Sequence, residues 1–226
     1  FRGTDLHVLG YQINYLSKDF VTLEKQIDSL VMNSFEAMVE NLHRLGIPVN
    51  ADEVLAATQG KLPSAELIAE VLLHNPGYSE ITALDPYRPG GNRGDMPYIN
   101  FYLDYFAQGK PAYVKIDYMD YAEAIDLIKR NGGIPVIAHP GHNFRGREEV
   151  VSDLLRLGAE GIEVFNNYHS PEQMQLLAGM AVRQQALMTC GSDFHGKTKP
   201  RIMVGQYGML SEYETYLQES LERLLS

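Results

Sequence analysis

The sequence predicts an α/β fold in which a mostly helical block, residues 17–112, precedes a run of alternating helices and strands. Two observations carry this prediction. Apolar residues recur every three or four positions through the first half, and short apolar runs separated by helical patterns fill the second half. With 226 residues and 45% apolar content, the chain can bury a core in one domain and still carry an inserted subdomain.

The N-terminal region changes its pattern near residue 20. Residues 4–13 are rich in β-forming side chains and predict a strand, although Gly10 weakens the pattern. From Phe20 to Leu45 the apolar residues recur at helical spacing, and Gly46 follows. This segment is therefore expected to be a long amphipathic helix that ends at the glycine.

Shorter helices complete the helical block. Asn50, with Glu53 in capping-box position, predicts the start of one helix, and Ser64 predicts the start of the next. The segment Asn75-Pro76-Gly77 is expected to end that helix. After a loop rich in proline and glycine, residues 98–106 are expected to be helical again.

Helices and strands alternate from residue 120 onwards. The predicted helices cover residues 120–131, 147–158, 170–184 and a C-terminal segment capped by Ser211 and Glu214. The predicted strands are "IPVIAHP", "GIEVFN", "ALMTCGSDFH" and a short "RIMVGQYG". Ser170, Pro171 and Gln173 form a complete capping-box signature for one of these helices. Continuous apolar strands joined through helices predict a parallel sheet or barrel covered by helices.

Composition excludes several classes of protein. A net charge of −10 argues against a broad surface that binds duplex nucleic acid, because such surfaces use clustered lysine and arginine. The single cysteine, Cys190, excludes an internal disulfide framework and suits a reducing compartment. No apolar run is long enough to cross a bilayer, and the N-terminus lacks the pattern of a signal peptide. These features predict a cytoplasmic location.

Polar side chains follow the predicted strands at the points where each strand ends. His139 follows "IPVIA", Asp193 and His195 follow "ALMTCGS", and Glu163 and Asn166-Asn167 lie in or just after "GIEVFN". In α/β sheets and barrels, ligands and catalytic groups gather at the carboxyl ends of the strands. Imidazole nitrogen and carboxylate oxygen suit Zn, Mn or Fe. The pattern predicts a divalent-metal site rather than a set of hydrogen-bonded structural residues.

The remaining histidines give weaker signals. His43 and His74 lie in predicted helices and are expected to be surface or packing residues. His142 and His169 lie in loops that follow strands, where a histidine can contact a ligand or cap a turn. Cys190 lies inside an apolar strand and is expected to be a buried thiol rather than a nucleophile.

Three segments carry a resemblance to a known family. "GGIPVIAHPG", "GAEGIEVFNNYHSPEQ" and "GSDFHG" are similar to the later motifs of the PHP (polymerase and histidinol phosphatase) family, in particular its nucleotide- and RNA-hydrolysing phosphoesterases. In that branch a strand similar to "HVLGYQI" precedes a helical insertion. The resemblance covers nearly the whole chain. It implies the later part of a distorted seven-stranded (β/α) barrel, with a barrel strand at 1–16, a helical insertion at 17–112 and the C-terminal barrel part at 113–226.

The resemblance also implies a set of metal ligands. His7 matches the single histidine that the family uses as a ligand at this strand, so that His7 and His139 would share one metal. Asp193 and His195 would serve the other ions of a cluster of two or three, with Mn, Zn or Fe as candidates. The family's first motif, His-x-His, has no counterpart, because Leu9 stands two residues after His7. The chain is therefore expected to lack the first strands, as a fragment or a naturally shortened member.

For the complete protein the resemblance implies metal-assisted hydrolysis of a small phosphoester, such as a nucleotide or a short oligonucleotide, with Asp193 and His139 as catalytic residues. Candidates for phosphate contacts from loops are His169, Arg145, Arg147 and Arg201. Without a bridging carboxylate and about half of the ligands, the chain alone is expected to have little activity. Its open sheet edge would favour a homodimer. No contact with a membrane is expected.

The substrate is left open by one departure from the family. Members of the nucleotide branch often carry Arg-Pro-His in the insertion, where this sequence has Leu62-Pro63-Ser64. Two other functions are also compatible with the sequence. The chain could be a non-catalytic binding or regulatory module, or a metal-dependent amide hydrolase. A lysine at a strand end, suitable for carbamylation, would favour the amide hydrolase, and none is evident on these strands.

Overall fold

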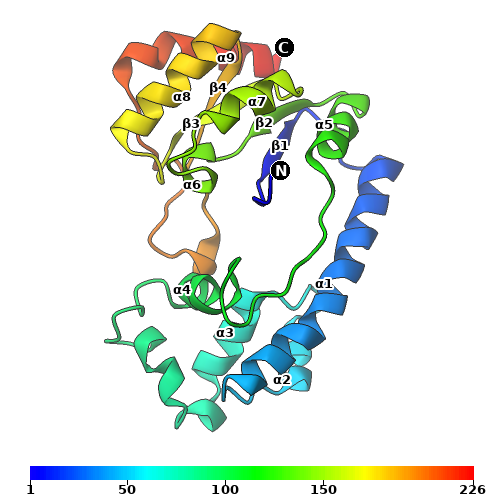
Figure 1. Ribbon diagram of the computed structural model, residues 1–226, viewed down its shortest axis with the longest axis vertical. Helices are drawn as coiled ribbons and strands as arrows, with labels where there is room; N and C mark the ends of the chain where they lie inside the picture. The colour runs from blue at the N-terminus through cyan, green and yellow to red at the C-terminus, as the bar shows by residue number, and fades with distance from the viewer. The chain divides into compact units, whose positions relative to one another are not determined.

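A four-stranded sheet forms the centre of one of the two units into which the chain divides (Figure 1). The computed structural model describes residues 1–226. The first unit consists of Phe1–Val21, Met119–Phe194 and Ile202–Ser226. The second consists of Thr22–Tyr118 and His195–Arg201. Each unit has its own buried apolar cluster.

The sheet has the order β1-β2-β3-β4 and mixes two strand directions. Its strands are β1 (Val8–Tyr11), β2 (Ile134–Ile137), β3 (Gly161–Asn166) and β4 (Leu187–Gly191). β2, β3 and β4 are parallel, as the alternation of helices and strands predicted. β1, whose direction the sequence left open, runs antiparallel to β2, with Val8 opposite Ile137.

The prediction of a short strand in "RIMVGQYG" is wrong, because residues 202–208 form no strand. Met203 and Val204 are exposed to 59% and 75%, so no neighbouring element buries the side chains that suggested a strand. Gly205 has a φ of +76°, which interrupts any extended run. Apolar residues alone did not define a strand here, since no partner strand pairs with this segment.

Five helices accompany the sheet in the first unit. They are α5 (Tyr121–Arg130), the short α6 (Pro140–Asn143), α7 (Val150–Arg156), α8 (Pro171–Gln184) and α9 (Glu214–Leu225). α5 packs against β2, α8 against β3, and α9 against β4 (Figure 1). Two predicted helix starts are confirmed. Asp120 caps α5 by accepting from the Ala122 amide, and Ser170 and Gln173 form the capping box of α8.

Two other cap predictions fail in whole or in part: the cap of α9 by Ser211 and Glu214, and the capping-box role of Glu53 at α2, where Asn50 itself is confirmed as the N-cap. α9 begins at Glu214 after a 3₁₀ turn, Ser211–Tyr213, and no side chain caps it. In the second unit, Asn50 caps α2 (Ala51–Ala57) through the Asp52 amide, but Glu53 does not complete a capping box. The Glu53 carboxylate instead accepts hydrogen bonds from the Tyr78 hydroxyl and the Asn75 amide group, both at 2.8 Å. Glu53 therefore accepts hydrogen bonds from residues distant in the sequence and does not make the local capping-box hydrogen bond.

The second unit is helical, as predicted. It contains most of α1 (Lys18–Arg44), then α2, α3 (Ala65–His74) and α4 (Pro97–Phe101), which continues as a π-helical turn, Tyr102–Phe106. Short 3₁₀ segments cover Pro76–Tyr78 and Thr82–Tyr87. Ser64 caps α3, and the helix ends before Asn75 as expected. The fully buried side chains at its centre include Leu42, Val54, Ile68, Leu84 and Phe101. None of the helices in the structure combines the length and apolarity needed to cross a membrane.

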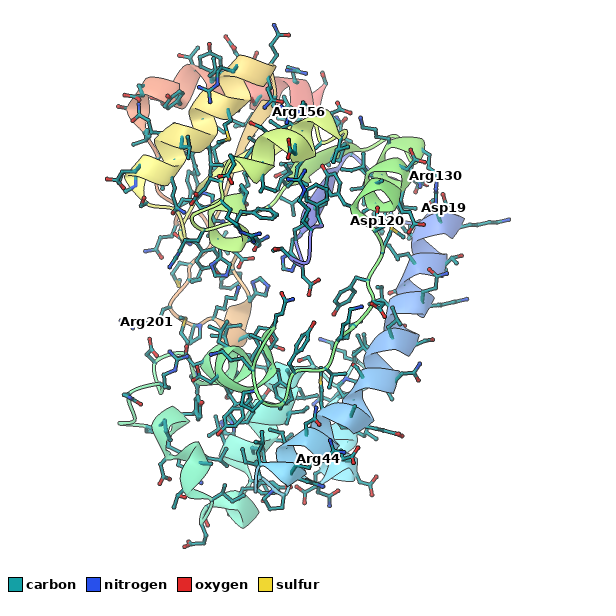
Figure 2. The ribbon with its side chains drawn as sticks, in the orientation of Figure 1. Asp19, Arg44, Asp120, Arg130, Arg156 and Arg201 are labelled. Carbon is teal, nitrogen blue, oxygen red and sulfur yellow. The ribbon has the colours of Figure 1, made fainter.

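The start of α1 belongs to the first unit and is attached there by an ion pair. Asp19 lies in the first turn of α1, and Arg130 is the last residue of α5; Figure 2 shows the two side chains beside each other. The Arg130 Nε donates to Asp19 Oδ2 at 2.7 Å, and this hydrogen bond lowers the pKa of the Asp19 carboxyl. Because both side chains are largely exposed, the pair adds little stability and serves mainly to define the geometry.

Two neighbouring leucines of α8 differ in burial and so provide a matched test of the fold. Leu177 is fully buried in the core of the first unit, whereas its neighbour Leu176 is 43% exposed. Leu177→Ala should lower the free energy of unfolding by about 2–5 kcal/mol, because it leaves a cavity beneath the sheet. Leu176→Ala should change it by less than about 0.5 kcal/mol. Urea unfolding followed by circular dichroism measures both, and equal losses would contradict the assignment of the buried face.

Candidate metal centre

The candidate metal centre lies at one edge of the sheet, where several strands end or begin. His139 follows β2 and Asp193 follows β4, and because these strands are parallel the two residues reach the same edge. His7 precedes β1. Since β1 runs antiparallel to β2, the start of β1 lies beside the end of β2, and the Ala138 amide donates to the His7 carbonyl at 3.1 Å.

His7 and His139 are in direct contact. His7 Nδ1 lies 3.2 Å from His139 Nε2, and the two rings meet edge to face with their centroids 5.1 Å apart. Two imidazole nitrogens at this separation share a proton between them or turn their lone pairs toward a common cation. The structure thus brings together two residues that are separated by 132 positions in the sequence and that were predicted as ligands of one metal.

His139 is held in an unusual conformation. Its side chain is buried, and its φ of +29° lies in a region that non-glycine residues seldom occupy. Its Nδ1 atom is buried and has no hydrogen-bond partner. Burial, assisted by the neighbouring His7, lowers the pKa of His139 to about 4. The imidazole is therefore neutral at pH 7, which is the form that binds metal ions.

Asp193 also has a left-handed backbone, with a φ of +55°. Its Oδ2 atom accepts a hydrogen bond of 2.6 Å from the Tyr168 hydroxyl, and the Tyr168 ring stands perpendicular to that of His139 at 5.9 Å. Burial and the Asp193 carboxylate raise the pKa of Tyr168, so this hydroxyl keeps its proton and stays a donor. Sequence reasoning missed Tyr168, because a tyrosine in the loop after a strand gives no signal that its hydroxyl contacts a predicted ligand.

Glu163 is a buried carboxylate beneath these residues. Its Oε2 atom accepts hydrogen bonds from the His139 main-chain amide at 2.9 Å and from Asn166 Nδ2 at 3.0 Å. Burial raises the pKa of the Glu163 carboxyl. The sequence placed Glu163 and Asn166 near the predicted site but gave neither a role. The available signal was an acidic side chain in the middle of the apolar strand "GIEVFN".

His195, the fourth predicted ligand, belongs to the second unit and is exposed. His7, His139 and Asp193 belong to the first. No group of three or more His, Cys, Asp or Glu side chains in the structure is arranged to hold a metal ion. The donor types nevertheless fit one, since a pair of imidazoles in contact, one of them neutral with a buried, unpartnered nitrogen, and a nearby carboxylate suit Zn, Mn or Fe.

The residues predicted to contact phosphate belong to both units, His169, Arg145 and Arg147 to the first and Arg201 to the second. His169 is buried; its Nδ1 bonds the Val164 carbonyl, and its Nε2 accepts from the Gly141 amide, so both ring nitrogens are engaged inside the protein. Arg145 and Arg147 are exposed after α6, and Arg147 donates to Thr4 Oγ1 at 2.9 Å. Arg201, labelled in Figure 2, pairs with Asp95 within the second unit at 2.8 Å.

Comparison with curated proteins found relatives that are all phosphoester hydrolases. The chain is 27% identical over 208 residues to phosphoribosyl 1,2-cyclic phosphate 1,2-diphosphodiesterase of Eggerthella lenta, covering 87% of the chain and 68% of that protein. It is 38% identical over 94 residues to 3',5'-nucleoside bisphosphate phosphatase of Chromobacterium violaceum, covering 40% and 33%. It is 26% identical over 198 residues to a 5'-3' exoribonuclease of Haemophilus influenzae, covering 86% and 66%. The chain thus spans about two thirds of two relatives and one third of the other.

Two solved structures share the fold. One is described as a metal-dependent phosphoesterase from Bifidobacterium adolescentis, with a TM-score of 0.74, 23% identity and coverage of 100% of this chain and 72% of that one. The other is described as an amidohydrolase from Chromobacterium violaceum with bound sulfate and no metal, with the same TM-score and identity and coverage of 99% and 73%. No protein-family model matches the chain.

The lowered pKa of His139 predicts how stability depends on pH in the metal-free protein. Below pH 6.5 the unfolded chain gains a proton at His139 that the folded state accepts only near pH 4. The free energy of unfolding should therefore fall by about 3 kcal/mol between pH 6.5 and 4 through this residue alone. His169, whose pKa burial also lowers, acts in the same direction, and Glu163, whose pKa is raised, acts in the opposite one.

His139→Asn isolates this contribution, since asparagine tolerates the left-handed backbone and does not titrate. Urea unfolding at several pH values should give a shallower decline for the variant than for the natural sequence. Parallel curves for the two proteins would show that the His139 proton is not linked to folding.

Proposed function

The chain is homologous to phosphoesterases of the PHP family, and on this premise we propose that the complete protein is a metal-dependent hydrolase of small phosphoesters. The observation that carries the proposal is the contact of His7 with His139 at the strand ends, with Asp193 at the same edge. Hydrolytic metal centres use neutral imidazoles and carboxylates on strand ends in this way.

The ligands in this proposal are His7, His139, Asp193 and His195, for two or three divalent ions among Mn, Zn and Fe. Such ions, when bound, activate water and neutralise charge on the phosphoryl oxygens. Neutral His139 offers the lone pair of one ring nitrogen without first losing a proton. Asp193, held by the Tyr168 hydroxyl, is suited both to bind and to orient the attacking water.

Beyond the metal ligands, the reaction requires only residues that bind the phosphate. A water oxygen forms a bond to phosphorus while the ester oxygen leaves, and the proton lost by the water ends on that leaving oxygen. Arg145, Arg147 and Arg201 remain candidates for binding phosphate, of which Arg145 and Arg147 extend from the loop after α6. His169 stays a weaker candidate, since it would have to release the Gly141 amide to bind phosphate.

The substrate class that the relatives favour is a phosphoester on ribose. A phosphoribosyl cyclic phosphate, a nucleoside bisphosphate and RNA are named for the three relatives, and each carries phosphate on a ribose. We extend this class to the present protein as a nucleotide, a short oligonucleotide or a similar small molecule. Arginine side chains and bound cations together match its charge.

The same proposal includes the fold of the complete protein, the activity of this chain alone, its association and its location. The four-stranded sheet would be the later part of a seven-stranded barrel, with residues 1–16 and 113–226 in the barrel and 17–112 as the helical insertion. This chain alone would then be weakly active or inactive. Two copies could associate through the outer strands β1 and β4, which each have a free edge. The location would be cytoplasmic.

Substituting predicted ligands tests the function directly. In the complete protein, His139→Ala and Asp193→Ala should each reduce Mn²⁺-dependent phosphate release from a nucleoside bisphosphate by more than about 100-fold, because ligand losses exceed the 10- to 100-fold effects of supporting residues. His74→Ala is the matched control, since His74 is exposed on α3 and is not a predicted ligand. It should retain the natural rate.

The same assay separates the alternative functions. Full phosphate release by His139→Ala or Asp193→Ala would refute the proposed centre. Hydrolysis of amide substrates but not phosphoesters would favour the amide hydrolase. Absence of any turnover in the complete protein with Mn²⁺, Zn²⁺ or Fe²⁺ would favour a binding module.

A further inference from the structure

A buried cross-strand hydrogen-bond network lies beneath the predicted ligands and centres on Glu163. This side chain is only 6% exposed, and no arginine or lysine pairs with it in the structure. Buried carboxylates are costly unless their oxygens are fully used. Here Oε2 accepts from the main chain after β2 and from Asn166 of β3, and Asn166 Nδ2 also donates to the Gly191 carbonyl of β4 at 3.0 Å.

An irregularity in β3 makes this network possible. Glu163 pairs with Thr189 and Phe165 pairs with Cys190, so Val164 is an extra residue with no partner on β4. In a regular strand, Glu163 and Asn166 would point to opposite faces because they are three residues apart. The extra residue restores them to the same face, where their side chains meet.

Gly191 leaves the space that the carboxylate occupies. A Cβ atom at position 191 would lie 2.1 Å from Glu163 Oε1, a distance that no real contact allows. Three strands thus contribute to one arrangement. The end of β2 supplies a main-chain amide, β3 supplies two side chains, and β4 supplies a glycine that leaves room for the carboxylate.

We propose that Glu163 is a positioning residue of the metal centre, which fixes the strained turn at His139 so that its imidazole faces His7. The main-chain amide that Glu163 binds belongs to the residue with the φ of +29°, and such a conformation persists only where its surroundings enforce it. The inference rests on the proposed function, since it concerns how the same centre is built.

Three variants of the complete protein test this role, with Mn²⁺ affinity read from the electron paramagnetic resonance of free Mn²⁺ and stability read from urea unfolding. Glu163→Leu keeps the approximate volume but removes both acceptors, and it should weaken Mn²⁺ binding by about 10- to 100-fold. Glu163→Gln keeps one oxygen that can accept from His139 and Asn166, and it should restore affinity close to that of the natural protein.

Ser220→Ala is the matched control for a purely structural loss. Ser220 is buried on α9, accepts from the Met188 amide of β4 at 2.9 Å and lies outside the centre. Its substitution should lower the urea midpoint and leave Mn²⁺ affinity unchanged. Glu163→Leu that loses stability but keeps natural Mn²⁺ affinity would overturn the proposal, and so would Glu163→Gln that binds as weakly as Glu163→Leu.

These outcomes are distinct from a failure of the proposed function. If the natural protein binds Mn²⁺ but releases no phosphate, the phosphoesterase proposal fails, while the affinities of the Glu163 variants still decide the positioning role. If phosphate is released and Glu163→Leu retains Mn²⁺ affinity, only the positioning role fails.

Discussion

The antiparallel pairing of β1 with β2 is the interaction on which the candidate centre depends. It sets Val8 opposite Ile137 and continues one step further, where the His7 carbonyl accepts the Ala138 amide. In a parallel arrangement, the residue before Val8 would lie at the opposite edge of the sheet from His139. The direction of one four-residue strand therefore determines whether the two histidines meet.

Local patterns were sufficient to predict much of the fold. Continuous apolar runs identified β2, β3 and β4, and their alternation with helices predicted a parallel arrangement that carries His139 and Asp193 to one edge. The direction of β1 was beyond such reasoning, because side-chain alternation is the same in either direction. The predicted strand at 202–208 failed for a related reason, since apolar side chains do not reveal whether a partner strand is available.

The supporting residues of the centre were harder to predict than its ligands. Glu163 and Asn166 are three residues apart, so simple alternation places them on opposite faces, and only the extra residue Val164 brings them together. Tyr168 reaches Asp193 across 25 positions of sequence through a single hydroxyl. The left-handed backbone of His139 likewise has no sequence signal, because strain there is imposed by neighbours rather than by the residue itself.

The insertion of the helical unit between β1 and β2 has a consequence for how the chain folds. β1 must find a partner that lies beyond Thr22–Tyr118, and closing a flexible loop of that length costs about 4 kcal/mol of entropy. The helical unit is nearly continuous in sequence and is built mostly of helices, whose backbone hydrogen bonds are local, which favours its early formation. Once the helical unit has folded, β1 and β2 are joined through a folded unit and no longer through a long flexible loop. Folding of the helices would then come first and favour the pairing of β1, the strand that follows His7.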